Sequence, residues 1–156
     1  MFLRTQDFRF KSLKDYNFQP NFVNISDKEI GILRIHYVDE GKKSDPAIIL
    51  LHGEPSWSYL YRHMIPILSN NGFRVVAPDL IGFGKSDKPQ DRNSYTYKSH
   101  VSWLTSLLNK LKIKNSVLFG QDWGGLIGLR ILVESPKFFS KVMIGNTAFP
   151  TGVENL

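Results

Sequence analysis

Residues 116–126 read SVLFGQDWGGL, and this stretch indicates how the chain folds. The run at 116–119 predicts a buried strand, and the glycines after it predict a sharp turn into a helix over 126–134. Asp122 sits between two glycines, so the tight turn exposes its carboxylate at the start of the helix, where the helix dipole favours negative charge. The stretch therefore predicts a strand–turn–helix unit that presents a carboxylate.

Strands and helices alternate outward from this unit. Short apolar or alternating runs predict five further strands, at 21–26, 33–39, 47–51, 73–77 and 141–144. Helical spacing predicts helices at 58–70 and 97–111, while 1–20 reads as an irregular, aromatic-rich lead-in and 80–92 as a loop. We therefore predict an α/β fold, a mostly parallel sheet flanked by helices, in one domain that covers 1–156.

A second unusual motif, HGEP at 52–55, follows the strand predicted at 47–51. The carboxyl ends of parallel strands meet at one edge of a sheet, and ligands bind there. We therefore expect this motif to lie beside Asp122. His52 precedes the turn, so we expect it to brace the loop by hydrogen bonds and not to act as a catalytic base.

The carboxylate of Asp122 itself suggests a reaction class. A serine that attacked a saturated carbon would form an ether, which water does not readily cleave, whereas a carboxylate forms an ester that water can hydrolyse. Asp122 therefore predicts displacement at saturated carbon followed by ester hydrolysis, with haloalkanes and epoxides as substrates. The alternative is an ordinary helix cap. The preceding strand, the flanking glycines and the His-Gly motif favour the nucleophile.

Two neighbours offer hydrogen-bond donors to this reaction. The backbone N–H of Trp123 is placed to stabilise the ester oxyanion, and its indole N–H suits a leaving halide. A packed core tryptophan is the alternative. Glu54 supplies the second oxyanion N–H, and its side chain can position water but should not bind halide, because like charges repel. The alternative for Glu54 is a surface residue.

Composition excludes several other classes. The chain has no cysteine, which excludes disulfides and thiolate chemistry. Its net charge is +6, but the basic residues are scattered, so we expect no nucleic-acid partner. No apolar stretch is long enough to span a bilayer and no signal peptide is visible, so we expect a cytoplasmic protein with no membrane partner. His36, His63 and His100 lack metal-ligand spacing, which predicts no metal site and ordinary packing or surface roles.

Other features have structural interpretations. The segment DLIGFGKS at 79–86 has the glycines of a phosphate-binding loop without the full spacing, so it predicts a structural loop. Trp57, Tyr59 and Tyr61 cluster near the expected site and predict core packing for most of the three. Trp103 lies on the helix predicted at 97–111 and also predicts a core position.

Together these motifs resemble the haloalkane dehalogenases, in the branch that carries glutamate after the His-Gly pair. The resemblance covers essentially the whole chain, and it is carried mainly by three segments: HGEPSWSYLYR at 52–62, APDLIGFGKSDKP at 77–89 and QDWGG at 121–125. The second segment is common among α/β-hydrolases, whereas Glu54 combined with Gln121-Asp122-Trp123 is more specific. The resemblance implies an α/β-hydrolase fold.

The resemblance also implies a mechanism. Asp122 would attack the halogen-bearing carbon of a small haloalkane and expel halide, which the indole of Trp123 would bind. A histidine-activated water would then cleave the ester while the backbone N–H groups of Glu54 and Trp123 hold the oxyanion. The reaction would give alcohol and halide and would need no cofactor.

The chain departs from the family pattern in one important respect. The family's base histidine lies near its C-terminus, whereas the last histidine here is His100, and the position after the sixth strand carries Asn146, which is no acid. We therefore expect residues 1–156 to be the N-terminal part of the core domain. It would be truncated after about the sixth strand, without the cap domain, and incomplete for turnover.

Two rival functions remain open from the sequence. Epoxide hydrolases share the aspartate nucleophile and often the tryptophan after it, but that family usually has an aromatic residue at the place of Glu54 and histidine at that of Gln121. A non-catalytic remnant of the fold is the second rival, and the absence of a late histidine supports it.

Overall fold

The computed structural model describes residues 2–148, so the ends of the predicted 1–156 domain, Met1 and 149–156, lie outside the described residues. Within that range a six-stranded sheet runs in the order β2-β3-β5-β4-β7-β8. Its strands are β2 (Asn21–Asp27), β3 (Gly31–Glu40), β4 (Ala47–Leu51), β5 (Arg74–Pro78), β7 (Ser116–Gln121) and β8 (Phe139–Gly145). All six predicted strands are confirmed, with ends shifted by a few residues.

The sheet is parallel over its central and far strands. β5, β4, β7 and β8 pair in parallel, while β2 and β3 form an antiparallel hairpin that joins β5. β5 is buried along its whole length and β4 over all but its first residue, as expected for parallel strands that are covered on both faces. At the hairpin turn, Oδ1 of Asp27 accepts hydrogen bonds from the backbone N–H groups of Glu29 and Ile30.

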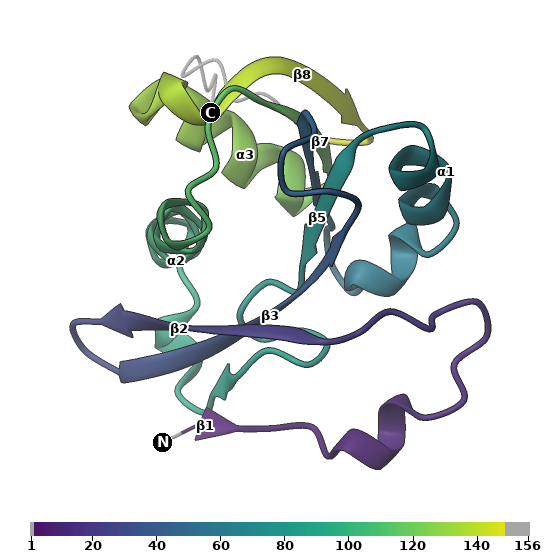
Figure 1. Cartoon of the computed structure of the whole chain (residues 1–156). Coiled ribbons are helices and arrows are strands. Elements are labelled where there is room, and N and C mark those ends of the chain that lie inside the picture. The colour runs from purple at the N-terminus through teal and green to yellow at the C-terminus, as the bar shows by residue number, and fades with distance from the viewer. Residues whose placement is uncertain (1, 149–156) are drawn as a thin grey trace.

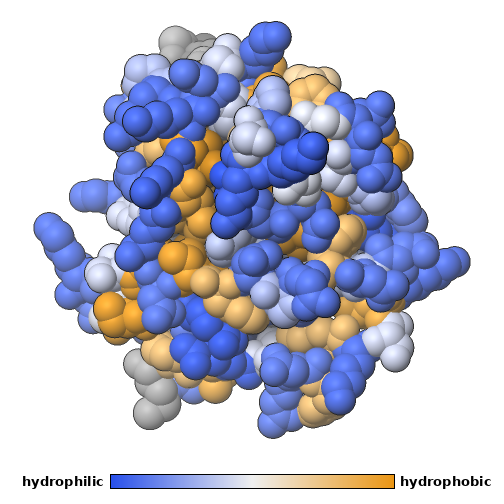
Figure 2. Space-filling model, in the orientation of Figure 1, coloured by the Kyte–Doolittle hydropathy of each residue, from blue (hydrophilic) through white to orange (hydrophobic). Residues whose placement is uncertain are grey.

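Helices cover both faces of this sheet, as Figure 1 shows. α2 (Tyr97–Lys110) and α3 (Trp123–Glu134) lie together on one face, and α1 (Met64–Asn70) lies on the other. The buried apolar residues form two clusters that correspond to these faces, one with α2 and α3 and one with α1. Polar side chains cover most of the molecular face in Figure 2 and leave scattered hydrophobic patches.

The prediction of one helix over 58–70 was wrong. The structure has a short 3-10 helix, η2 (Ser58–Tyr61), and then the separate helix α1. Pro66 explains the break, because proline has no backbone N–H and its ring hinders the carbonyl four residues earlier, at Arg62.

The lead-in at 1–20 and the loop at 80–92 contain more regular structure than predicted. β1 (Phe2–Leu3) pairs with β6 (Lys88–Pro89), and the Arg4 guanidinium binds both carboxylate oxygens of Asp87. Three further 3-10 helices are η1 (Asp7–Phe10), η3 (Arg92–Ser94) and η4 (Pro136–Phe138). The strand pairing joins residues more than 80 positions apart, so local sequence patterns do not reveal it.

Aromatic residues attach the lead-in to the rest of the molecule. The ring of Trp57 lies 5.0 Å from that of Tyr16 and 5.4 Å from that of Phe10, and it stacks on Tyr59. Trp57, Tyr59 and Tyr61 pack on the α1 side of the sheet, so their predicted packing role is confirmed, and none of the three lines the cavity next to Glu54 and Trp123.

Trp103 is buried as predicted, and its indole N–H also donates to Asp27 at 2.7 Å. No helix in the described part of the chain combines the length and the apolar character that crossing a membrane requires.

Candidate active site

The candidate site lies where three parallel strands end. β5, β4 and β7 are neighbours, and the segments after them contain Asp79-Leu80, His52-Gly53-Glu54 and Asp122. The predicted meeting of the HGEP motif with Asp122 is therefore confirmed. This edge is where α/β sheets bind ligands, because the loops there converge and no crossover helix covers it.

Asp122 occupies a strained position between β7 and α3. Its backbone angles are φ 52° and ψ −127°, in a region that favours glycine. Two bonds from the segment after β8 hold this conformation. The Asp122 N–H donates to the carbonyl of Asn146 at 3.0 Å, and the Thr147 hydroxyl donates to the carbonyl of Asp122 at 2.7 Å. The predicted sharp turn is therefore confirmed, and α3 begins at Trp123, three residues earlier than expected.

The glycines of the turn allow β4, β7 and α3 to approach one another closely. A methyl group on Gly124 would overlap the carbonyl oxygens of Leu51 and His52, at the end of β4. A methyl group on Gly120 would lie 2.7 Å from Cα of Gly125. The Gly-x-Asp-x-Gly spacing is thus required by packing as well as by the turn.

The carboxylate of Asp122 faces the loop that follows β4. Its Oδ1 accepts a hydrogen bond from the backbone N–H of Glu54 at 2.9 Å. A methyl group on Gly53 would overlap the same carboxylate. An N–H group placed beside a carboxylate oxygen is also placed beside the oxygen of an ester formed on that carboxylate.

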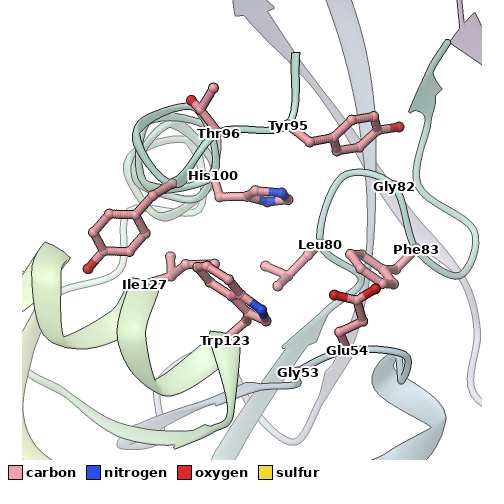
Figure 3. A pocket seen from close by; sticks show the side chains of 11 residues that line it. Gly53, Glu54, Leu80, Gly82, Phe83, Tyr95, Thr96, His100, Trp123 and Ile127 are labelled. Carbon is pink, nitrogen blue, oxygen red and sulfur yellow. The ribbon is translucent and has the colours of Figure 1, made fainter. Parts of the chain in front are cut away.

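Trp123 is the first residue of α3, so its backbone N–H has no acceptor inside the helix. Its side chain is 43% exposed and lies 6.3 Å from the ring of Tyr97. Figure 3 shows the indole nitrogen turned toward the space between Trp123 and Glu54. The indole is therefore accessible to a ligand.

His52 braces the site, as the sequence indicated. The residue is fully buried, its Nε2 accepts from the backbone N–H of Leu80 at 2.9 Å, and its Nδ1 lies 2.8 Å from the carbonyl of Gly53. Burial lowers the pKa of its imidazole, although the hydrogen bond to Gly53 opposes this shift. A neutral ring that donates from Nδ1 and accepts at Nε2 satisfies both contacts. His52 thus links the loops after β4 and β5.

Asp79 anchors the loop that the sequence assigned a structural role. Its Oδ1 accepts from the Ser58 N–H at 2.9 Å, and its Oδ2 accepts from Lys85 N–H at 2.7 Å and lies 2.8 Å from Nδ1 of His36. Burial acts to raise the pKa of the Asp79 carboxyl, but the contacts with His36, Ser58 and Lys85 outweigh it and lower the pKa. Asp79 therefore remains an ionised acceptor that shapes the loop and does not line the cavity.

A cavity of about 410 Å³ opens beside these groups. Its walls are mainly apolar, and Figure 3 shows how the side chains surround it. The lining residues are Gly53, Glu54, Leu80, Gly82, Phe83, Tyr95, Thr96, Tyr97, His100, Trp123 and Ile127. The predicted site residues Glu54 and Trp123 are thus brought together in its wall, with Asp122 bonded to Glu54 beside it.

Sequence reasoning missed some residues at this site. Thr147, which holds the Asp122 carbonyl, carries no local signal, because its role depends on the pairing of β7 with β8. Tyr95 and Tyr97 line the cavity, whereas the sequence showed only that Tyr97 begins the helix predicted at 97–111. His100 was assigned an ordinary role, and it also lies in the cavity wall. Within residues 2–148, no three His, Asp or Glu side chains are arranged to hold a metal ion.

Comparison with protein families supports this description of the fold. The family model for the alpha/beta hydrolase fold matches residues 46–155. A haloalkane dehalogenase from Psychrobacter cryohalolentis is 56% identical over 154 residues, which are 99% of this chain and 51% of that protein. A haloalkane dehalogenase from Mycolicibacterium paratuberculosis is 49% identical over 149 residues, 96% of this chain and 50% of that protein. The chain thus spans about half the length of these curated relatives.

Solved structures give the same picture. A tetrameric haloalkane dehalogenase from Paraglaciecola agarilytica matches with a TM-score of 0.89 and 45% identity, over 95% of this chain and 50% of that one. An epoxide hydrolase from Vigna radiata matches with a TM-score of 0.73 and 28% identity, over 83% of this chain and 41% of that one. In fold and in sequence, this chain is therefore more similar to that dehalogenase than to that epoxide hydrolase.

Proposed function

This chain belongs to the alpha/beta hydrolase fold family, and from that premise we propose that it carries the nucleophilic half of a haloalkane dehalogenase site. The proposed reaction converts a small haloalkane and water to an alcohol and a halide ion. Asp122 is the nucleophile, Glu54 and Trp123 supply the oxyanion N–H groups, and the indole of Trp123 binds the halide.

One observation carries this proposal. The Asp122 carboxylate, at a strained turn between β7 and α3, accepts the Glu54 N–H at 2.9 Å beside a largely apolar cavity. A carboxylate that only capped a helix would bond to the N–H groups of its own first turn, and the Asp122 side chain makes no such bond. Its partner instead belongs to another strand's loop, which suits a group held for reaction.

The first step balances without any added reagent. An Asp122 carboxylate oxygen forms a bond to the carbon that bears the halogen, and the electron pair of the carbon–halogen bond leaves with the halide. The Trp123 indole N–H donates to the departing anion. The product is an alkyl ester of Asp122, and no cofactor takes part in this step.

The second step hydrolyses that ester. Water adds to the ester carbonyl, the oxyanion is held by the N–H groups of Glu54 and Trp123, and the alcohol leaves as the carboxylate of Asp122 returns. A base must accept a proton from the water. His52 is not available for this, because both of its ring nitrogens contact the backbone in a fully buried position. We assign no base among residues 2–148.

The choice of dehalogenation over epoxide opening has specific support. Glu54 and Gln121 stand where epoxide hydrolases usually carry an aromatic residue and a histidine. Relatives at 56% and 49% identity are dehalogenases.

Covalent labelling of Asp122 tests the proposal. The protein is incubated with excess 1-bromohexane, and intact mass and peptide mapping are followed together with bromide release. We expect one hexyl group per chain, located on Asp122, with bromide released at the same initial rate. Asp122→Asn should abolish both signals, while Asp7→Asn, at an exposed position, should leave them unchanged. Alkylation of a residue other than Asp122 would reject dehalogenation. So would the absence of alkylation by 1-bromohexane under conditions in which a terminal epoxide does label Asp122.

A further inference from the structure

His100 is the one polar side chain of the cavity wall that neither the fold nor the proposed chemistry employs. The cavity lining includes six polar or partly polar side chains, those of Glu54, Tyr95, Thr96, Tyr97, His100 and Trp123. Each of them can be assigned to a partner or to a step of the reaction, apart from His100.

Three of these side chains bond within the protein. The Tyr95 hydroxyl donates to the carbonyl of Pro89 at 2.8 Å, and the Tyr97 hydroxyl donates to the carbonyl of Leu126 at 2.8 Å. The Thr96 hydroxyl oxygen accepts from the Ser99 N–H at 3.0 Å and caps α2. Glu54 and Trp123 belong to the proposed reaction.

The ring nitrogens of His100 open onto the cavity. Among residues 2–148, the buried side-chain nitrogens and oxygens that lack a hydrogen-bond partner are Nε of Arg34 and Nε of Arg62. The ring nitrogens of His100 are not among these buried atoms, and no described residue forms a hydrogen bond with the ring. Figure 3 shows the ring projecting from α2 into the space between Tyr95 and Leu80, across the cavity from Glu54 and Trp123. A polar group of the wall therefore faces the interior opposite the reacting groups.

The surroundings hold this ring in place and keep it neutral. The centroid of its ring lies 5.1 Å from that of Trp103, in a T-shaped arrangement, and 6.2 Å from that of Tyr95. Burial, with a smaller contribution from His52, lowers the pKa of His100 to about 4. At neutral pH the imidazole therefore offers one N–H donor and one nitrogen acceptor to the cavity.

We propose that His100 recognises a hydroxyl group on the end of the substrate away from the halogen, so that the cavity favours haloalcohols over haloalkanes of equal size. This inference rests on the proposed function for its reacting end. A hydroxyl both donates and accepts, as the neutral imidazole does. An anionic end is disfavoured, because the carboxylates of Asp122 and Glu54 would repel it.

Matched substrates test this preference. The rate of Asp122 alkylation is measured by mass spectrometry with 6-bromohexan-1-ol and with 1-bromoheptane, in which a methyl group replaces the hydroxyl. We expect His100→Phe, which keeps an aromatic ring beside Trp103, to lower the alcohol-to-alkane rate ratio by about 3- to 10-fold, the range of one neutral hydrogen bond. His100→Gln should keep part of the ratio, because its amide still donates and accepts. His63→Phe, the same change at an exposed histidine, should not alter it.

A binding measurement separates this inference from the proposed function. With ¹⁵N-labelled histidine, hexan-1-ol should shift the His100 nitrogen resonances, which His100→Phe identifies by their loss. No shift up to the solubility limit of hexan-1-ol would overturn the inference, as would equal rate losses for both substrates in both His100 variants. If Asp122 of the parent protein reacts with no alkyl bromide but hexan-1-ol still shifts the His100 resonances, the dehalogenase proposal is rejected. Recognition of a hydroxyl group by His100 is then still supported.

Discussion

The backbone N–H of Glu54 donates to Oδ1 of Asp122 at 2.9 Å, although 68 positions separate the two residues in the chain. Asp122 ends the turn after β7, and Glu54 lies in the loop after the neighbouring strand β4. This contact places a donor against the oxygen on which an ester would form. Its geometry depends on the small residue between the two loops, which leads to the first prediction.

Gly53→Ala should displace the carboxylate of Asp122. The added methyl group would overlap the Asp122 carboxylate and push it from its position. Moving a reacting group by about 1 Å lowers rates by about 100-fold. We therefore expect at least that loss in the rate of Asp122 alkylation by 1-bromohexane. Gly145→Ala is the matched control, because among the described residues no atom lies within 4 Å of its added carbon. A Gly53→Ala rate within a factor of three of the parent rate would contradict the geometry.

Gly124→Ala should destabilise the fold as well as the site. Its methyl group would meet the carbonyl oxygens of Leu51 and His52, which belong to backbone that cannot move without disturbing the centre of the sheet. We expect the free energy of unfolding in urea to fall by about 3 kcal/mol, as in other overpacked cores. Gly145→Ala again serves as the control. Equal urea midpoints for the two variants would show that α3 can shift away from β4.

Asp79 should make stability depend on pH. The lowered pKa of its carboxyl means that ionised Asp79 stabilises the folded state above its ordinary pKa of about 3.9. That contribution is lost as the pH falls through the lower folded-state value. At pH 7 we expect Asp79→Asn to cost about 3 kcal/mol, because an amide cannot accept from His36, Ser58 and Lys85 alike.

Urea unfolding of the parent and Asp79→Asn between pH 7 and pH 3 measures this dependence. The difference in stability between the two proteins should be largest at neutral pH and shrink as the pH falls below about 4. Asp7→Asn, at an exposed position, should show no comparable change. A difference that stays constant with pH would mean that the charge of Asp79 makes no contribution.

Trp123→Phe should separate halide binding from packing. Phenylalanine keeps an aromatic ring beside Tyr97 but lacks the indole N–H. Loss of one donor to developing charge costs about 100-fold in rate, so we expect alkylation of Asp122 by 1-bromohexane to slow by that order. Trp57→Phe, in the aromatic cluster on the α1 side of the sheet, should leave the rate unchanged. An unchanged rate in Trp123→Phe would remove the indole from the mechanism.

Much of this site was visible in the sequence because its signals are local. The strand, the two glycines and the aspartate at 116–126 specify a turn by backbone geometry alone, and the turn is present with Asp122 at φ 52°. The continuous apolar run at 47–51 likewise predicted a strand covered on both faces. Parallel strands then require their carboxyl ends to share one edge, so the meeting of Glu54 with Asp122 followed from the order of the elements.

Other features were decided by contacts between distant segments. The pairing of β1 with β6 depends on residues far apart in the chain. Thr147 reaches the Asp122 carbonyl only because β8 pairs beside β7. The place of His52 before a turn indicated its bracing role, whereas nothing in the sequence indicated that His100 faces the cavity.

The sequence by itself thus determined the turn that presents the Asp122 carboxylate and the edge of the sheet where it lies, because a tight turn and parallel strands are set by short-range geometry. Only the tertiary structure decided which side chains surround that group. The positions of Tyr95, Tyr97 and His100 follow from how α2 packs against α3, and such packing depends on the fit of side chains from many parts of the chain.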